Sequence, residues 1–286
     1  MKTIFGGIFS PRILYIIPVI FLLIFFLYPL LAIFDRSLRP DGILRLEGFI
    51  TLITHAYYRN TVWFTLWQAV ISTILTLICA IPTAFVFTRY QFPLKSVLLT
   101  LATLPFVLPT VVVATAFRAL IDNNGMLNQI AMTLFGLDRP PIQLERTLTM
   151  IFIAHVFYNY PLALRMIYGY WANQSGRIEE AGRLLGARGW RLWIDIRLPM
   201  IRPMIWASAL LVFTFTFTSF GVILLLGGLR YATIEVEIYN QAVNVFNLPM
   251  AAVLSAVQMM ILLFALNLYA RLQRNITIVS LQSHKA

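Results

Sequence analysis

The chain has 286 residues, of which 60% are hydrophobic and only 12% are charged, and its mean hydropathy is +0.81. Because a soluble domain has about 25% charged residues, a water-soluble core could not bury this much apolar surface. We therefore expect an all-α membrane protein with lipid around its helices. The formal charge of +11 falls mainly in short loops between apolar runs, a pattern typical of membrane orientation, and we expect no nucleic-acid partner.

Six apolar runs follow one another along the chain. They comprise residues 13–34, 62–88, 97–120, 147–171, 204–226 and 248–270. Each is long enough to cross a hydrocarbon core of about 30 Å at about 1.5 Å per residue. The first run is too long for the apolar part of a signal peptide, so we expect it to remain as a membrane helix. The sequence therefore predicts six transmembrane helices.

Proline residues distinguish the third span, and basic loops indicate the orientation of the chain in the membrane. The third run contains Pro105 and Pro109, whose missing amides free backbone carbonyls that other helices or a water-lined cavity must satisfy. Six spans place both termini on one side of the membrane. The loops on that side carry most of the Lys and Arg residues outside the spans, which predicts that both termini are cytoplasmic.

Groups that could carry catalysis or bind a metal are scarce. The three histidines and Cys79 are scattered, and no zinc-ligand spacing, nucleophile motif or phosphate-binding G-x-x-x-x-G-K-[ST] loop occurs. All 11 acidic residues lie in loops or at span edges, whereas an ion-coupled transporter keeps an ionisable group near the midplane. We expect no catalytic residue, no metal site and no cofactor in this chain. A secondary transporter and a membrane-embedded enzyme are distant alternatives.

Polar side chains in the fourth and fifth spans could line a transport path. His155 and Asn159 lie four residues apart, so they either line a polar path or form hydrogen bonds between helices. Thr214, Thr218 and Gly221 are expected to share one face of the fifth span, which either lines a path or allows close helix packing. The path candidates are Asn159, Thr214, Thr218 and Gly221.

A charged segment, residues 176–203, separates the fourth span from the fifth. Ser175 or Gly176 is expected to cap a short helix there, with Glu179 and Glu180 in its first turn, where carboxylates favour the positive end of the helix dipole. The apolar face of this helix comprises Ile178, Ala181, Leu184 and Leu185. A helix this short is marginal unless its apolar face packs on something.

A second short helix follows two glycine residues. It is expected to run from Trp190 to Ile196 and to end at Pro199, and Pro203 is expected to start the fifth span. The residues alone leave two interpretations of this helical elbow, a basic loop on the membrane surface or a helix pair that docks on a partner.

The spacing within this segment resembles that of a known family. The residues Glu180, Ala181, Gly182, Gly186, Ile196, Leu198 and Pro199 are similar to the E-A-A-x3-G-x9-I-x-L-P signature of permease subunits of ATP-binding-cassette importers. One position departs from the signature, because Gly182 stands where alanine is usual, at a cost of about 1 kcal/mol in helix propensity. The resemblance covers residues 60–271.

The resemblance implies a bacterial inner-membrane permease subunit that is not itself an enzyme. It implies a first span and periplasmic connection in residues 1–60, a permease core in residues 61–274, and a cytoplasmic tail in residues 275–286. In that family the loop between the fourth and fifth spans is a coupling helix that sits in a cleft of the ATPase subunit. The residues implied in coupling are Glu180, Ala181, Gly182, Leu184, Leu185, Gly186, Ile196, Leu198 and Pro199.

The same resemblance implies several partners. They are ATP-binding-cassette ATPase subunits, a second permease subunit that is identical or homologous, a periplasmic or lipid-anchored solute-binding protein, and membrane lipid. The segment 218–221, with Gly227, Gly228 and residues 234–239, is similar to permeases of the thiamine and ferric-iron branch. Polyamine permeases share much of this plan and are the alternative. Thiamine permeases of this kind carry two such halves in one chain, so a single half would need to pair.

Overall fold

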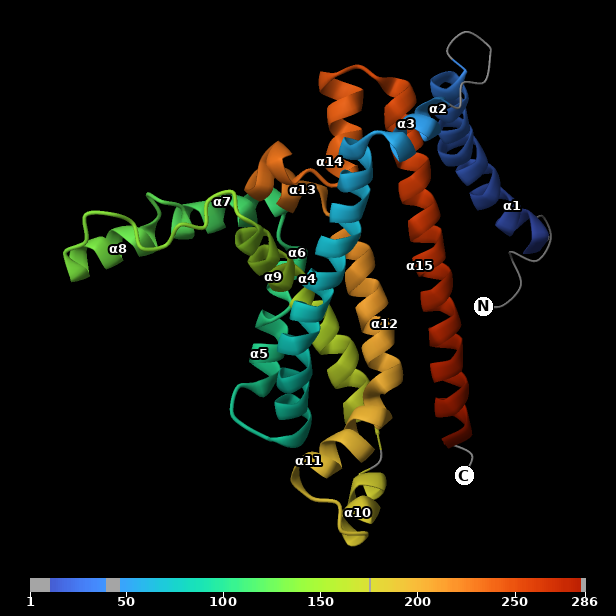
Figure 1. Cartoon of the computed structure of the whole chain (residues 1–286). Coiled ribbons are helices and arrows are strands. Elements are labelled where there is room, and N and C mark those ends of the chain that lie inside the picture. The colour runs from blue at the N-terminus through green and yellow to red at the C-terminus, as the bar shows by residue number, and fades with distance from the viewer. Residues whose placement is uncertain (1–10, 40–46, 175, 284–286) are drawn as a thin grey trace, which may run out of the picture. The chain divides into compact units, whose positions relative to one another are not determined.

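The computed structural model describes residues 11–39, 47–174 and 176–283, and within these ranges it contains helices and turns without a strand (Figure 1). The expected all-α fold is confirmed. The chain divides into two compact units, residues 1–59 with 238–256 and residues 60–237 with 257–286. All the candidate functional residues belong to the second unit.

The first unit holds the first predicted span. The helices α1 (Pro11–Leu22), η1 (Leu23–Leu27) and α2 (Tyr28–Leu38) follow one another without a break and enclose that span. Its other described elements are α3 (Glu47–Thr54), η5 (Asn240–Asn244) and the beginning of α15 (Leu248–Ser283). Gly48 of α3 lies so close to Val253 of α15 that a Cβ atom would stand 2.8 Å from its Cγ2 atom.

The second unit is built mainly from long helices with short helical pieces between them. These elements are α4 (Ala56–Arg89), α5 (Lys95–Leu101), α6 (Leu104–Val107), α7 (Thr110–Ile121), α8 (Met126–Phe135), α9 (Leu148–Ala172), α10 (Arg177–Leu184), α11 (Gly189–Leu192), η2 (Trp193–Arg197), α12 (Leu198–Phe217), α13 (Phe220–Val222), η3 (Ile223–Gly227), η4 (Gly228–Tyr231), α14 (Ile234–Tyr239) and the greater part of α15. The most extensive contact between two helices is that of α9 with α12.

Small residues lie in the apolar cluster that α4, α9 and α12 share. Ala80 and Ala84 of α4 and Ala163 of α9 are fully buried, and they lie in one apolar cluster with Ile201 and Val212 of α12. Alanine side chains allow close approach of helix backbones, which is how helices gain packing energy when lipid surrounds them. These three helices therefore form the core that positions the candidate sites.

Four described helical segments are long and apolar enough to cross a membrane, and a fifth is added if a bent pair forms one span. The four segments are Ala56–Arg89, Leu148–Ala172, Gly189–Phe217 and Leu248–Gln273. Within the first predicted span, the described apolar segment is shorter and comprises Ile16–Leu27. The count of six transmembrane helices stays a prediction.

The third predicted span is not one straight helix. The segments Lys95–Val107 and Thr110–Phe135 are bent by 103° relative to each other. Leu108, directly before Pro109, has an extended backbone with φ −69° and ψ 138°, because the ring of a proline disfavours helical geometry in the preceding residue. The helix of the predicted span over 97–120 is therefore interrupted at this point, next to one of the two prolines noted in the sequence.

The fifth span begins earlier than expected. Helix continues from Gly189 to Phe217, so Pro199 does not end a helix and Pro203, inside α12, does not start one. The segment η2, which ends at Arg197 two residues before Pro199, is a π-helix. A π-helical turn accommodates a nearby proline, which cannot donate a backbone hydrogen bond.

The fifth span also ends earlier than expected. Helix α12 ends at Phe217, and Ser219 has an extended backbone with φ −78° and ψ 90°. Short helical pieces from Phe220 to Asn244 replace the end of the predicted span and the residues that follow it. Thr214, Thr218 and Gly221 therefore do not share one continuous helical face.

The predicted tail over residues 275–286 is helical through Ser283, as the last part of α15. Residues 284–286 lie outside the described residues. Backbone hydrogen bonds thus continue past the apolar run, which ends near Ala270.

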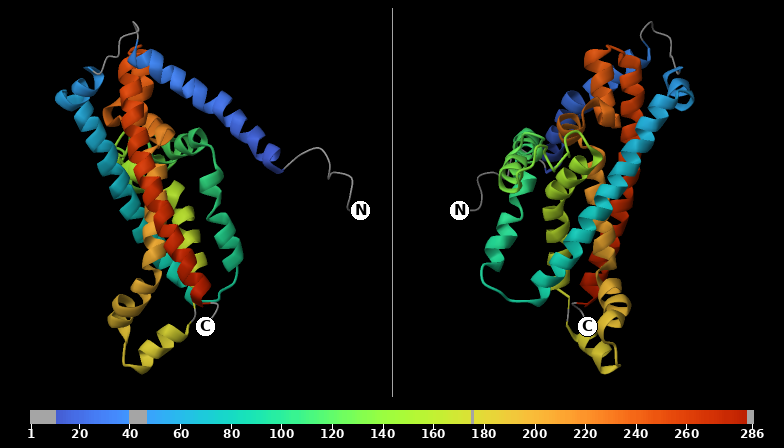
Figure 2. Two further views of the ribbon diagram at one scale, coloured as in Figure 1. Left: turned by 90° about the vertical axis from the view of Figure 1, so that its right-hand side faces the viewer. Right: turned by 60° about the vertical axis from the view of Figure 1, so that its left-hand side comes forward.

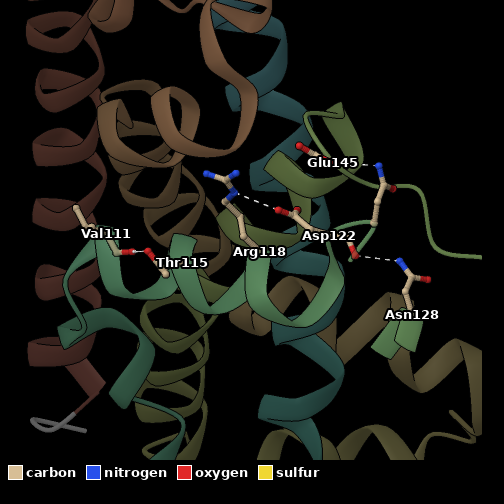
Figure 3. Close-up of polar contacts among 7 residues, drawn as sticks. Val111, Thr115, Arg118, Asp122, Asn128 and Glu145 are labelled. Atoms are coloured by element: carbon tan, nitrogen blue, oxygen red, sulfur yellow. Dashed lines mark hydrogen bonds and ion pairs between the residues drawn. The ribbon is translucent and has the colours of Figure 1, made fainter. Parts of the chain in front are cut away.

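Helices α7 and α8 project sideways from α9 (Figure 1) and are tied to the following loop by buried Asn128. The amide of Asn128 donates to the carbonyl oxygens of Asp122 (3.0 Å) and Ile142 (2.7 Å), and its Oδ1 atom accepts from the backbone amide of Ile142 (2.8 Å). Figure 3 shows this side chain beside the ion pair of Arg118 with Asp122, whose N–O distance is 3.1 Å.

Replacing Asn128 with alanine is expected to loosen the loop over residues 136–146, because the side chain's three hydrogen bonds to the backbone of Asp122 and Ile142 are lost. The expected cost is about 1–3 kcal/mol, which corresponds to a rise in local opening of about fivefold to more than a hundredfold. Hydrogen–deuterium exchange of residues 122–146 measures it. Asn124→Ala, which removes an exposed side chain, is the control, and equal exchange in the two variants would contradict the assignment.

Candidate functional site

The charged segment forms a helical elbow, here defined as residues 176–199, which joins α9 to α12. It comprises α10, a turn, α11 and η2, and it projects beyond the ends of α9 and α12 (Figure 2). The expected helix pair is therefore present. Ser175, one of two expected caps, lies outside the described residues, and the other, Gly176, occupies the N-cap position.

Backbone hydrogen bonds end α10 in a tight turn. The amide of Gly186 donates to the carbonyl oxygen of Arg183, and the amide of Ala187 donates to that of Gly182, both at 3.0 Å. This pair of bonds defines a Schellman motif, whose residue after the C-cap adopts left-handed geometry. Gly186 has φ +90°, which explains why the motif position calls for glycine.

Some residues of the motif face the inside of the elbow. Gly182 is buried, and a Cβ atom at this position would collide with Cδ1 of Ile196. Leu192 lies next to the same position and is also buried. Glycine in place of the usual alanine thus makes room for the side chain of Ile196.

Other residues of the motif face outward. The side chains of Leu184 and Leu185 are 89% and 90% exposed. Glu180, Ala181, Leu198 and Pro199 are exposed as well. The tip of the elbow thus carries an apolar surface that the rest of the unit leaves uncovered, with an acidic residue at its edge.

An ion pair closes the elbow. Oε1 of Glu179 accepts hydrogen bonds from Nη2 of Arg183 and from Nη2 of Arg197, each at 2.7 Å. The first pair joins neighbouring turns of α10, whereas the second links α10 to η2 across 18 positions of sequence. The side chain of Arg197 is only 8% exposed.

Aromatic side chains enclose Arg197, the cation of this ion pair. The guanidinium carbon of Arg197 lies 4.8 Å from the ring centroid of Phe85 and 5.3 Å from that of Trp193. Phe85 of α4 also contacts Trp193 and Trp171, with centroid distances of 4.7 and 5.7 Å. Cation–π attraction and ring packing therefore fasten the elbow to the ends of α4 and α9.

This arrangement lowers the pKa of Glu179 below its ordinary value of 4.5. The main cause is the hydrogen bond from Arg197, which stabilises the ionised carboxylate, while burial opposes the shift and Arg183 adds to it. Because the folded-state pKa is depressed, the stabilisation is present above pH 4.5 and is lost as the pH falls through the lowered pKa.

Sequence reasoning placed Glu179 at a helix start but did not find its pairing with Arg197. No sequence periodicity relates two residues 18 positions apart, so only the fold reveals the pair. Arg197 lies between the motif positions Ile196 and Leu198, which was the available signal.

A second candidate site is a cavity of about 400 Å³ in the second unit, here called the bundle cavity. It lies between α9, the break in the third predicted span and the break in the fifth predicted span, after which α13 begins. Its lining residues are Phe106, Leu108, Thr110, His155, Tyr158, Asn159, Phe215, Thr218, Ser219, Phe220, Gly221 and Val222.

Three of the four path candidates line this cavity. They are Asn159, Thr218 and Gly221, whereas Thr214 is not among the lining residues. Gly221 also packs closely, since a Cβ atom there would stand 2.8 Å from Cγ2 of Thr110. Lining and close packing, the two interpretations of this position, therefore apply together.

Buried hydrogen bonds fix the polar wall of the cavity. Oγ of Ser72 lies 3.1 Å from Nδ1 of His155, and Nδ2 of Asn159 donates to the carbonyl oxygen of His155 and to Oγ1 of Thr216. Gln68 donates to the carbonyl oxygen of Thr216. The polar pair on α9 thus joins helices and lines a cavity as well.

Sequence reasoning missed Ser72, Gln68 and Thr216. Ser72 and Gln68 lie four residues apart on α4 and are fully buried. That spacing was the available signal, because polar residues on one face of a membrane helix commonly bond across helices. Among the described residues, no group of three or more His, Cys, Asp or Glu side chains could hold a metal ion.

Comparisons with known proteins give the family. The sequence pattern of a family described as "Binding-protein-dependent transport system inner membrane component" matches residues 77–278. The chain belongs to this family. The family resemblance inferred from the elbow motif is thereby confirmed, and so is the membrane character of the fold.

Thiamine permeases are among the similar curated proteins. The chain is 31% identical over 233 residues to the thiamine transport system permease protein of Escherichia coli K12, a match that covers 80% of the chain and 42% of the relative. The corresponding protein of Haemophilus influenzae is 31% identical, with coverage of 76% and 40%. The chain thus spans about two fifths of the length of these relatives.

Two other similar proteins are matched over almost their whole length. A permease protein of Salmonella typhi, provisionally named for 2-aminoethylphosphonate transport, is 23% identical over 91% of the chain and 90% of the relative. A bacterial ATP-binding-cassette transporter involved in alginate import has a similar fold, with a TM-score of 0.75 at 19% identity and coverage of 91% and 96%.

Replacing Glu179 with glutamine is expected to loosen the elbow, because the buried guanidinium of Arg197 loses its charged partner. The expected cost is about 1–3 kcal/mol, seen as faster hydrogen–deuterium exchange in residues 176–199. Glu180→Gln is the matched control, since it neutralises the exposed neighbour on the same helix. In the wild type, lowering the pH through the depressed pKa of Glu179, which lies below 4.5, should reproduce the effect. Exchange that does not change with either treatment would contradict the ion pair's role.

Replacing Gly182 with alanine is expected to destabilise the elbow, although alanine favours helix. The gain in propensity is about 1 kcal/mol, whereas overpacking against Ile196 costs about 1–3 kcal/mol. The double variant Gly182→Ala with Ile196→Val removes the colliding methyl group and should recover the exchange protection of α10. Greater protection in the single variant than in the wild type would show that Ile196 moves aside freely.

Proposed function

We propose that this chain is the membrane-spanning permease subunit of an ATP-driven, binding-protein-dependent importer. Its family membership and its elbow support the proposal, and the observation that carries it is the exposed apolar tip on a rigidly fastened base. ATP is hydrolysed on separate ATPase subunits, since this sequence has no phosphate-binding loop. This chain therefore catalyses no covalent reaction and needs no cofactor of its own.

The elbow couples ATP hydrolysis to transport in this proposal. Leu184, Leu185 and Ala181 enter a cleft of the ATPase subunit, with Glu180 at the edge of the contact. Gly182, Gly186 and Ile196 shape the elbow from inside, and Leu198 and Pro199 lead into α12. Because Glu179 and Arg197 tie the tip to the base, a push on the tip moves the ends of α4, α9 and α12 together.

The orientation follows from the same contact. The elbow carries arginine residues at positions 177, 183, 188, 191 and 197, which favours the cytoplasmic side. The termini lie on that side too if the chain crosses the inner membrane six times. The protein is therefore a multi-pass component of a bacterial inner membrane with cytoplasmic termini.

The bundle cavity is the proposed translocation path within this subunit. Asn159, Thr218 and Gly221 contribute to its wall, whereas Thr214 takes part in helix packing. A second permease subunit, identical or homologous, completes the path, and a solute-binding protein delivers the cargo from the periplasm. Alternating opening to either side moves the cargo across the membrane.

The cargo is a small solute, and thiamine is favoured by the similarity to thiamine permeases. Ferric iron and polyamines are the alternatives within the family. Uptake by the complete importer, reconstituted in proteoliposomes with its ATPase and binding protein, tests the function. Absence of ATP-dependent uptake for every one of these solutes would overturn the proposal.

Charge introduced at the tip of the elbow is expected to uncouple transport. Leu184→Asp and Glu180→Lys should insert into the membrane normally and yet reduce ATP-driven uptake by tenfold or more, since an unpaired charge buried at a docking surface costs about 2–5 kcal/mol. Gly186→Asp should act similarly through the left-handed turn. Uptake and ATP hydrolysis in proteoliposomes measure the effect.

Leu94→Asp is the control for this prediction. Leu94 is 68% exposed and lies in the loop between α4 and α5, with φ +63°, a geometry that aspartate tolerates better than leucine. It should transport normally. Normal transport by the elbow variants would remove the elbow from coupling.

A further inference from the structure

The walls of the bundle cavity combine aromatic faces with neutral polar atoms. Phe106 and Phe215 meet edge to face with centroids 5.6 Å apart, and Tyr158 and Phe220 complete the aromatic lining. Its volume of about 400 Å³ lies within the range of about 300–1,000 Å³ that is typical of small-molecule sites.

The lining that this subunit contributes offers no charged partner to several classes of cargo. None of its residues is Asp, Glu, Lys or Arg. A polyamine calls for carboxylates, a phosphonate calls for arginine or lysine, and ferric iron calls for anionic oxygen ligands. Aromatic faces, in contrast, suit a flat ring and also attract a ring that carries positive charge.

Two of the polar residues that α9 contributes to the lining are His155 and Asn159. Nε2 of His155 is buried without a hydrogen-bond partner in the described structure, while Nδ1 of the same ring lies 3.1 Å from Oγ of Ser72. If the Ser72 hydroxyl donates to Nδ1, the proton resides on Nε2, which then acts as a donor. The amide nitrogen of Asn159 already donates two hydrogen bonds, which leaves its Oδ1 atom as an acceptor.

We propose that the bundle cavity is a transit site for a small amino-substituted heteroaromatic ring. This proposal rests on the importer function proposed above. Nε2 of His155 donates to a ring nitrogen, Oδ1 of Asn159 accepts from the adjacent amino group, and the aromatic side chains cover the ring faces. The donor and the acceptor, four residues apart on α9, are the complementary groups that the edge of an aminopyrimidine requires.

Binding to the purified importer complex tests the proposal without ATP or the binding protein. Saturation-transfer difference NMR with thiamine should give a signal, strongest on the pyrimidine protons. Spermidine and 2-aminoethylphosphonate should give none. Oxythiamine, in which a ring carbonyl replaces the amino group, should bind about tenfold more weakly, because Oδ1 of Asn159 then faces another acceptor.

Matched substitutions locate the site within the protein. Phe215→Leu and Thr218→Val alter the lining and should weaken thiamine binding by about fivefold each. Phe213→Leu and Thr214→Val are the controls, because both residues lie on α12 outside the lining, and Thr214 bonds its helix backbone in the same way as Thr218 does. The controls should bind thiamine normally.

The outcomes separate this site from the importer function. No thiamine signal in the wild type, equal binding of oxythiamine, or equal loss in lining and control variants would each overturn the ring site. ATP-dependent uptake by the same preparation is measured independently. Uptake of any solute without thiamine binding would leave the importer function standing and reject the ring site alone.

Discussion

The ion pair of Glu179 with Arg197 is the contact on which the elbow depends. A helix as short as α10 is unstable alone in water, so it needs a partner in the fold. The pair provides one by joining α10 to η2, while Phe85 and Trp193 enclose the guanidinium. The apolar tip can then stay exposed, because the stability of the elbow comes from its base.

The motif residues have two physical roles, because some shape the base of the elbow and others are exposed at its tip. Gly182, Gly186 and Ile196 determine the internal shape of the elbow through a close contact and a left-handed turn. Leu184 and Leu185 do not stabilise the subunit by burial and are exposed at the tip. The proposed coupling role needs both, since force reaches the spans only through a rigid connection.

The bundle cavity lies where two spans lose regular helical structure. The third span breaks at residues 108–109 and the fifth at residues 218–219, and residues from both breaks line the cavity. Non-helical backbone is tolerated at membrane depth where it faces a cavity or protein instead of lipid. Helices α9 and α12 run from this cavity to the elbow, so the two candidate sites share the same pair of helices.

The sequence by itself determined the helical membrane class, the position of the elbow and the family, because apolar run length and motif spacing are local properties. It also indicated His155 and Asn159 as a polar pair. Only the tertiary structure decided which motif residues face inward, that Arg197 pairs with Glu179, and that Thr218 lines the cavity whereas Thr214 does not. These features depend on helix breaks and on contacts between residues far apart in sequence, which helical periodicity does not encode.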